Sequence, residues 1–257
     1  MRPGNAGHVL VCMAFSLQQY PDLIYKGNMM KETLLHIFEL LLAQYGPLHW
    51  WPAETPFEIC VGAILTQNTN WRNVEKAIVN LKQAGVLTAE AFRDLPRERL
   101  AALIKPAGFF NVKSVRLQEF IRWLYGGYGG SLENMFSGDW RELREEMLKV
   151  KGIGRETCDS ILLYAGHKPT FVVDAYTVRL FSRLGLVREN AGYEEVRSLF
   201  MMNLPGDAGL FNEYHALIVQ HGKDHCRKKP GCKGCVLHPY AGMTVGSTRL
   251  RPFCLAR

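Results

Sequence analysis

Hydrophobic positions recur along most of the chain at the three- and four-residue spacing of amphipathic helices. Residues 32–45 carry apolar side chains on one face, and residues 56–65 are apolar nearly all round, which predicts a buried helix. Further helical patterns cover residues 71–84, 98–104, 112–125, 140–150, 157–165, 193–204 and 211–221. No alternating run is long enough to predict a strand. The pattern therefore predicts an all-α protein.

A short glycine turn with the sequence Lys-Gly-Ile-Gly-Arg separates two of these predicted helices, the first of which Asp139 is expected to cap. Gly152 and Gly154 permit positive φ and close approach of another backbone. The amides that follow begin a helix, whose dipole favours an anion, and Lys151 and Arg155 add positive charge. The turn is typical of a phosphate-binding hairpin. An ordinary turn between helices remains the alternative, because short Gly-x-Gly patterns are common.

An aspartate follows the hairpin on an apolar segment. Asp174 comes directly after residues 171–173, which are Phe-Val-Val, and precedes a new helical pattern. As a helix N-cap it would contribute about 1 kcal/mol. A desolvated carboxylate can also stabilise an oxocarbenium-like sugar and orient a water molecule. Both roles are open on the sequence alone.

Composition narrows the class of partner. The chain has 257 residues, 47% of them hydrophobic, and a net charge of +7. This charge suits a polyanionic partner, although many basic proteins bind no nucleic acid. No stretch predicts a membrane span, and the short apolar run at residues 9–17 lacks a convincing cleavage site, so a cytoplasmic protein associated with the nucleoid is expected. Residues 1–30 are expected to be an extension outside the folded part.

Several motifs in order give the chain a family resemblance. Residues 64–70 read Ile-Leu-Thr-Gln-Asn-Thr-Asn, and residues 108–113 read Gly-Phe-Phe-Asn-Val-Lys. With the glycine hairpin and Asp174, they resemble the helix-hairpin-helix (HhH-GPD) superfamily of DNA glycosylases, within it the endonuclease III family, and most of all the 3-methyladenine glycosylase III type. The resemblance covers about residues 31–240.

The resemblance implies two helical domains with a DNA cleft between them. Residues 54–166 would form a barrel-like domain, and residues 31–53 would join residues 167–240 in the second. Residues 241–257 form a tail unlike the family. The expected partner is double-stranded DNA that contains a damaged base, and the family acts as a monomer.

The resemblance also assigns DNA contacts. Residues 64–70 would place a glutamine in the DNA near the extruded base, and residues 108–113 would wedge the duplex. The assigned residues are Gln67, Asn68, Phe109, Asn111, Lys113, Lys151, Gly152, Gly154 and Arg155.

One departure from the family bears on mechanism. Relatives that also cleave the strand carry a lysine where this chain has Glu156, and a lysine amine can attack C1′ whereas a carboxylate cannot. The resemblance therefore implies a monofunctional glycosylase that uses Asp174 and water. Glu156 itself would bind a substrate edge or be a solvated helix residue. The alternatives are an endonuclease III-like glycosylase and lyase for oxidised pyrimidines, and a non-catalytic DNA-binding protein, for which Asp174 would have no use.

Four aromatic residues near the first motif are candidates to stack on a base: Trp50, Trp51, Phe57 and Trp71. Electron-rich rings favour a cationic base such as an alkylated purine. Such a base is also a good leaving group and needs little acid catalysis. Packing in the core is the alternative for each ring.

Three cysteines lie close together near the end of the helical part, namely Cys226, Cys232 and Cys235. Such spacing indicates a metal or cluster site. The endonuclease III family holds a [4Fe–4S] cluster with four cysteines here, but the fourth position in this chain is Ala241. His238 or Cys254 would have to substitute. A cluster, a zinc site and a degenerate remnant are therefore all open.

Overall fold

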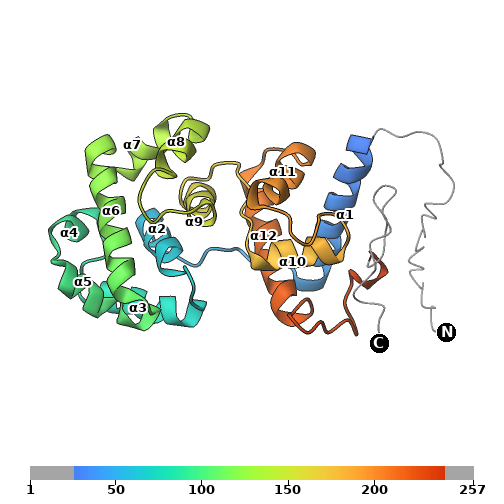
Figure 1. Cartoon of the computed structure of the whole chain (residues 1–257), viewed down its shortest axis with the longest axis horizontal. Helices are drawn as coiled ribbons and strands as arrows, with labels where there is room; N and C mark the ends of the chain where they lie inside the picture. The colour runs from blue at the N-terminus through green and yellow to red at the C-terminus, as the bar shows by residue number, and fades with distance from the viewer. Residues whose placement is uncertain (1–25, 241–257) are drawn as a thin grey trace, which may run out of the picture.

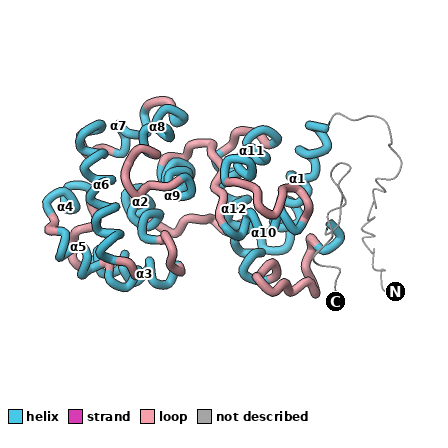
Figure 2. The backbone as a smooth tube through the Cα atoms, in the orientation of Figure 1, coloured by secondary structure: helices cyan, strands magenta, loops and turns pink. Residues whose placement is uncertain are grey.

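The computed structural model describes residues 26–240, and within them it is helical throughout without a strand, as Figures 1 and 2 show. The all-α prediction is confirmed. Helix α1 (Lys26–Tyr45) begins inside the expected extension, so residues 26–30 are part of the first helix and that boundary was wrong. Ala241 and Cys254 lie outside the described residues, as does the rest of the tail.

The first group of helices occupies one half of the molecule (Figure 1). It contains α2 (Pro56–Leu65), α3 (Trp71–Gln83), α4 (Ala89–Asp94), α5 (Arg97–Leu103), the 3₁₀ turn η2 (Lys105–Ala107), α6 (Phe110–Tyr128), α7 (Leu132–Ser137), α8 (Trp140–Met147) and α9 (Arg155–Ser160).

The second group gathers the two ends of the helical part. Helix α1 lies against α11 (Tyr193–Asn203) and α12 (Ala208–Asp224), and α10 (Ala175–Arg183) lies against α12. The 3₁₀ turn η4 (His238–Tyr240) closes this part. Residues 46–55 and residues 166–174 connect the two groups (Figure 2).

Each group has its own hydrophobic core. The first core is built from α2 to α9, and the second from α1 and α10 to α12. Trp51 and Ile59 pack against both cores. Leu163 and Tyr164 follow α9 in the chain but are buried in the second core. Apolar contact therefore joins the two halves.

Short polar residues start the helices that carry the motifs. Thr55 accepts a hydrogen bond from the amide of Glu58 at the start of α2, and Asn70 caps α3 in the same way. Asp139 accepts from the amides of Arg141 and Glu142, which confirms it as the cap of α8. Helix α9 continues as one π-helical turn, η3 (Ile161–Ala165). A π-turn shifts the following side chains around the helix axis and is often found at functional sites.

A buried carboxylate ties the two halves together. Asp159 on α9 is fully buried. Its two carboxylate oxygens accept hydrogen bonds from Arg144 of α8, at 2.8 and 2.9 Å. It also accepts from Thr170 at 2.7 Å and from the hydroxyl of Tyr193 on α11 at 2.8 Å. Arg197 of α11 lies 3.6 Å away. Such a bidentate pair with further donors offsets the cost of burying the charge.

We expect Asp159→Asn to lower the free energy of unfolding by about 3 kcal/mol, because it leaves the buried Arg144 guanidinium without its main counter-charge. Chemical denaturation would measure this loss. The control is Arg188→Gln, which removes the exposed pair between Arg188 and Glu195. The control should leave the unfolding free energy unchanged within error. Equal effects of the two variants would show that the Asp159 network does not hold the halves together.

Candidate functional site

The glycine hairpin connects α8 to α9 and is shaped by one of its two glycines. Gly152 has φ 94°, and a Cβ there would collide with the side chain of Arg116. Gly154 has φ −91° and open space around its Cα. The expectation of positive φ is met by Gly152 alone. Gly154 instead starts α9 without a side chain over its first amides.

The glutamine of the first motif holds this hairpin in place. The Gln67 amide donates to the carbonyl of Gly152 at 3.0 Å and to the hydroxyl of Thr157 at 2.9 Å. Arg116 donates to its oxygen. Its neighbour Asn68 is exposed, with φ 54°. In the protein without DNA, Gln67 is thus a support for the hairpin, and its expected insertion into DNA stays a prediction.

The second motif forms an exposed turn in front of α6. Gly108 and Phe109 have φ values of 68° and 46°, and the Phe109 side chain is 68% exposed. Asn111 is exposed as well. An apolar ring held out in solvent is consistent with the expected wedge, which stays a prediction.

Lys113 differs from the expectation. Its side chain is only 1% exposed, and its ammonium donates to the carbonyls of Leu65 and Ala107, both at 2.8 Å. Burial, helped by the charge of Arg116, lowers the pKa of Lys113 to about 8. The assignment of a direct DNA contact was therefore wrong, and Lys113 instead fixes the turn from inside. The sequence did not reveal this role, because Lys113 belongs to a motif whose other residues were expected to contact DNA.

The charged residues of the hairpin remain on the surface. Lys151 is exposed, and the Arg155 side chain is 58% exposed with Glu194 3.5 Å away. Both are accessible to a polyanion, which would compete with Glu194 for Arg155.

Asp174 takes the first of the two roles that the sequence left open, and its catalytic role stays a prediction. It follows the buried Val172 and Val173 and caps α10. Its Oδ1 accepts from the amide of Thr177 at 2.8 Å and from the hydroxyl of Thr177 at 2.9 Å. Its Oδ2 lies 3.8 Å from Nε2 of His215. One oxygen is thus used by the cap and the other faces away from it.

Glu156 lies close enough to Asp174 for their charges to interact. Glu156 is an exposed residue, but partial desolvation of its carboxyl, together with the Asp174 carboxylate, raises the pKa of Glu156 to about 7. Two carboxyl groups whose charges interact therefore lie beside the hairpin.

The three tryptophans of the predicted base pocket do come together. Trp51 contacts Trp71 edge-on at 5.0 Å between ring centroids, and Trp50 lies 6.2 Å from Trp51. The Lys223 ammonium lies 5.3 Å from the Trp50 ring, and the Trp50 indole N–H is buried without a hydrogen-bond partner in the described part. All three are partly exposed. Their stacking on a base stays a prediction.

Phe57 does not belong to this cluster. It is 7% exposed and packs against Phe92 in the first core, 5.3 Å between centroids. Of the two possibilities that the sequence left open for Phe57, core packing is therefore the one that the structure shows, because it lies on the inner face of the buried helix α2.

Contacts run from the tryptophans to the acid through two residues that the sequence did not indicate. The Tyr164 ring lies 5.1 Å from Trp51, and its hydroxyl lies 2.5 Å from Nδ1 of His215. His215 faces Asp174. Both residues occur inside apolar helical patterns, where they are typical of core positions, so only the structure reveals their connection to the site.

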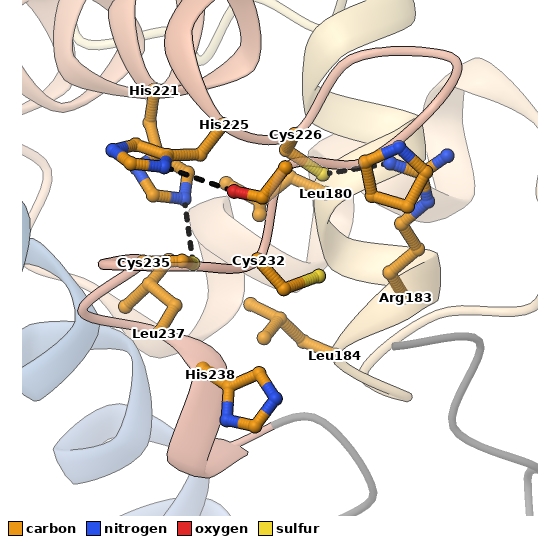
Figure 3. A pocket seen from close by; sticks show the side chains of 12 residues that line it. Leu180, Arg183, Leu184, His221, His225, Cys226, Cys232, Cys235, Leu237 and His238 are labelled. Atoms are coloured by element: carbon orange, nitrogen blue, oxygen red, sulfur yellow. Dashed lines mark hydrogen bonds between the residues drawn. The ribbon is translucent and has the colours of Figure 1, made fainter. Parts of the chain in front are cut away.

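The cysteine loop lies on the far side of the second group from the hairpin. Cys226, Cys232 and Cys235 line one pocket, which Figure 3 shows with His221, His225 and His238 around it. Arg183 donates to the Cys226 sulfur at 3.2 Å, and the Cys235 sulfur lies 3.4 Å from Nε2 of His221.

This donor set fits a metal group in part. Within residues 26–240, no three His, Cys, Asp or Glu side chains converge closely enough to hold a single ion. Zinc needs sulfur ligands at about 2.3 Å from one point, whereas a cluster accepts thiolates that are further apart. Three thiols around one pocket are thus the arrangement that a cluster would use, and Ala241 offers no fourth thiolate.

None of the helices in the described range combines the length and apolar character that crossing a membrane requires.

Comparison with known proteins supports the family resemblance. Residues 61–205 match the model of the HhH-GPD superfamily base excision DNA repair proteins. A Methanocaldococcus jannaschii protein with the provisional name of a DNA repair glycosylase is 47% identical over 210 residues, 81% of this chain and 96% of the relative. Endonuclease III of Thermotoga maritima is 31% identical over 183 residues, 71% of this chain and 80% of the relative.

Solved structures of DNA glycosylases also match this chain. The H. pylori 3-methyladenine DNA glycosylase MagIII, bound to 1,N6-ethenoadenine, matches with a TM-score of 0.65 and 30% identity, over 76% of this chain and 97% of that one. A non-covalent endonuclease III–DNA complex matches in fold with a TM-score of 0.69 at 23% identity, over 81% and 94% of the two chains.

We expect Gly152→Ala to lower the free energy of unfolding by about 1–3 kcal/mol, because it strains the backbone and displaces Arg116. Gly154→Ala is the matched control and should stay within about 0.5 kcal/mol of the wild type, because its backbone is extended and its surroundings are open. Chemical denaturation of both variants measures the difference. A Gly154 effect as large as that of Gly152 would contradict this account of the hairpin.

Proposed function

Because the chain belongs to the HhH-GPD superfamily and is a base excision repair DNA glycosylase, we propose that it removes an alkylated purine, such as 3-methyladenine, by a monofunctional mechanism. Asp174 would act on the sugar, and water would be the nucleophile. The observation that carries this proposal is the pair of carboxylates, Glu156 and Asp174, under a hairpin where related lyases have an amine.

The two carboxylates determine which reaction the site can perform on the sugar. As the glycosidic bond breaks, positive charge develops on the sugar, and a fixed carboxylate nearby stabilises it. Asp174 is held by Thr177 and is mostly buried, with 14% of its side chain exposed. Glu156 cannot form a Schiff base with C1′. Hydrolysis by water, which leaves the strand uncut, is the reaction that these groups support.

The aromatic cluster supports a cationic substrate. The ring faces of Trp50, Trp51 and Trp71 attract positive charge, and a base that carries this charge leaves without prior protonation. The matched H. pylori protein is named for 3-methyladenine and was solved with an etheno-adenine bound, which is a modified purine. A glycosylase reads such a base after flipping it out of the duplex, and Trp51 is linked to Asp174 by contacts through Tyr164 and His215.

The cysteine loop would have a structural role. We infer that Cys226, Cys232 and Cys235 hold an iron–sulfur cluster, because the three thiols line one pocket at the place where the endonuclease III family is expected to hold one. The cluster would keep the basic loop at residues 227–233 in a fixed shape. No step of base release passes through it.

Duplexes with one methylated purine, one etheno-adenine or one oxidised pyrimidine test the substrate. We expect base release from the methylated duplex, and Asp174→Asn should lower its single-turnover rate by about 10²–10³-fold because the charge is lost. DNA binding and the α10 cap should survive, since asparagine caps as well as aspartate. Asp207→Asn, the same change at the cap of α12, is the matched control and should retain activity.

Borohydride trapping separates the alternatives. The wild type should give no covalent complex on any duplex, whereas Glu156→Lys places an amine at the lyase position and should be trapped. A trapped wild-type adduct on the oxidised duplex would establish the glycosylase and lyase instead. DNA binding without release of any base would support the non-catalytic alternative.

The raised pKa of Glu156 predicts a pH dependence of stability. The folded state binds more protons than the unfolded state between about pH 4.3, the ordinary value for glutamate, and about 7. The free energy of unfolding should therefore fall through this window as pH rises, and Glu156→Gln should remove that part of the fall. Urea denaturation at several pH values measures the difference.

Glu195→Gln provides the control. Arg188 beside it lowers the pKa of the Glu195 carboxyl, but the pair is exposed and screened by solvent, so this variant should keep the pH profile of the wild type within error. If Glu156→Gln and the wild type have parallel profiles, the Glu156 carboxyl is not desolvated by its neighbours.

A further inference from the structure

A buried histidine faces the free oxygen of the proposed catalytic acid. His215 lies on α12 with 8% of its side chain exposed, and its Nε2 is buried with no hydrogen-bond partner in the described part of the chain. That atom lies 3.8 Å from Oδ2 of Asp174. An unpaired buried N–H or lone pair is costly, so its position beside a carboxylate requires an explanation.

The contact of the other ring nitrogen allows either tautomer of the neutral imidazole, and the Asp174 carboxylate favours one of them. Nδ1 of His215 lies 2.5 Å from the hydroxyl of Tyr164, which is itself buried. A tyrosine hydroxyl that donates to Nδ1 leaves the proton of the neutral ring on Nε2. The opposite tautomer would direct a lone pair at the Asp174 carboxylate, which is electrostatically unfavourable. The geometry therefore presents an N–H to Oδ2.

We propose that Tyr164 and His215 form a positioning pair that holds Asp174 in its working orientation. This inference rests on the proposed role of Asp174 in base release. Thr177 donates to Oδ1, and Nε2 of His215 faces Oδ2 at 3.8 Å, so a donor group lies on the side of each oxygen. A shift of less than about 1 Å closes the second contact to hydrogen-bond length.

The pair also bears on a neighbouring charge. Glu156 is the other acid that interacts with Asp174, and like charges that lie close together repel each other. An N–H directed at Oδ2 of Asp174 offsets part of this repulsion. The reaction needs Asp174 ionised, because only the carboxylate stabilises a positive sugar.

The position of Tyr164 links this pair to the base pocket. Tyr164 lies on the π-turn η3, and its ring contacts Trp51 while its hydroxyl reaches His215. The π-turn thus places one residue against both the tryptophans and the histidine. Neither Tyr164 nor His215 needs to touch the DNA for this role.

Nitrogen NMR of the free full-length protein tests the geometry without any assay of activity. With ¹⁵N-labelled histidine, we expect His215 to show a protonated Nε2 and an unprotonated, hydrogen-bonded Nδ1. Asp174→Asn should move the Nε2 resonance, and Tyr164→Phe should move that of Nδ1. A ring protonated on Nδ1, or resonances that neither variant moves, would overturn the proposal.

Single-turnover base release tests the consequence. We expect Tyr164→Phe and His215→Leu to lower the rate by about 10- to 100-fold, the range seen when outer partners of a site residue are removed. His215→Gln retains an N–H donor and should recover part of the loss. Affinity for a duplex with an abasic-site analogue should stay at the wild-type level.

The matched control is Tyr214→Phe. Tyr214 precedes His215 on α12, is equally buried, and its hydroxyl donates to the carbonyl of Leu34 at 2.8 Å, away from Asp174. It should lose stability but keep the wild-type rate. Rates for Tyr164→Phe and His215→Leu equal to the wild type, in a protein where Asp174→Asn abolishes release, would refute the positioning role. A wild type that releases no base would refute the proposed function alone, and the NMR result would still decide the pair.

Discussion

The arrangement of the site depends on one buried carboxylate. Asp159 accepts hydrogen bonds from Arg144 in the first group of helices, from Tyr193 in the second, and from Thr170 in the segment between them. Because the Asp159 carboxylate is buried away from water, its charge is stable only while all these donors are in place. The segment that carries it begins at the hairpin and ends in the π-turn, and Thr170 lies just before Asp174. The network therefore fixes the distance between the hairpin and the acid.

Within this frame, the site is a continuous set of contacts from an aromatic cluster to an acid. Trp51 touches Tyr164, Tyr164 bonds to His215, and His215 faces Asp174. Glu156 approaches the same acid from the hairpin side. The proposed base pocket and the proposed catalytic acid are thus built from neighbouring residues, as a reaction that involves a cationic base and a cationic sugar would require.

Local patterns predicted much of this from the sequence. Helical periodicity predicted the all-α fold, and the glycine turn followed by Asp174 indicated the site because those features lie within one short stretch. Lys113 was misassigned, since a motif does not reveal which side of a helix faces the core. For Phe57 the sequence left core packing open, and the structure shows that packing. Tyr164 and His215 were missed for a related reason. They stand in apolar runs typical of buried helices, and only the packing of α12 against η3 brings their polar atoms together.

The central claim is that a carboxylate and water, without an amine, perform base release. Mass spectrometry of the DNA strand after reaction with a methylated-purine duplex, with no alkali added, tests it most directly. We predict the free base and an intact strand that carries one abasic site. A strand already cleaved on the 3′ side of that site, with an unsaturated sugar end, would show β-elimination and contradict the claim.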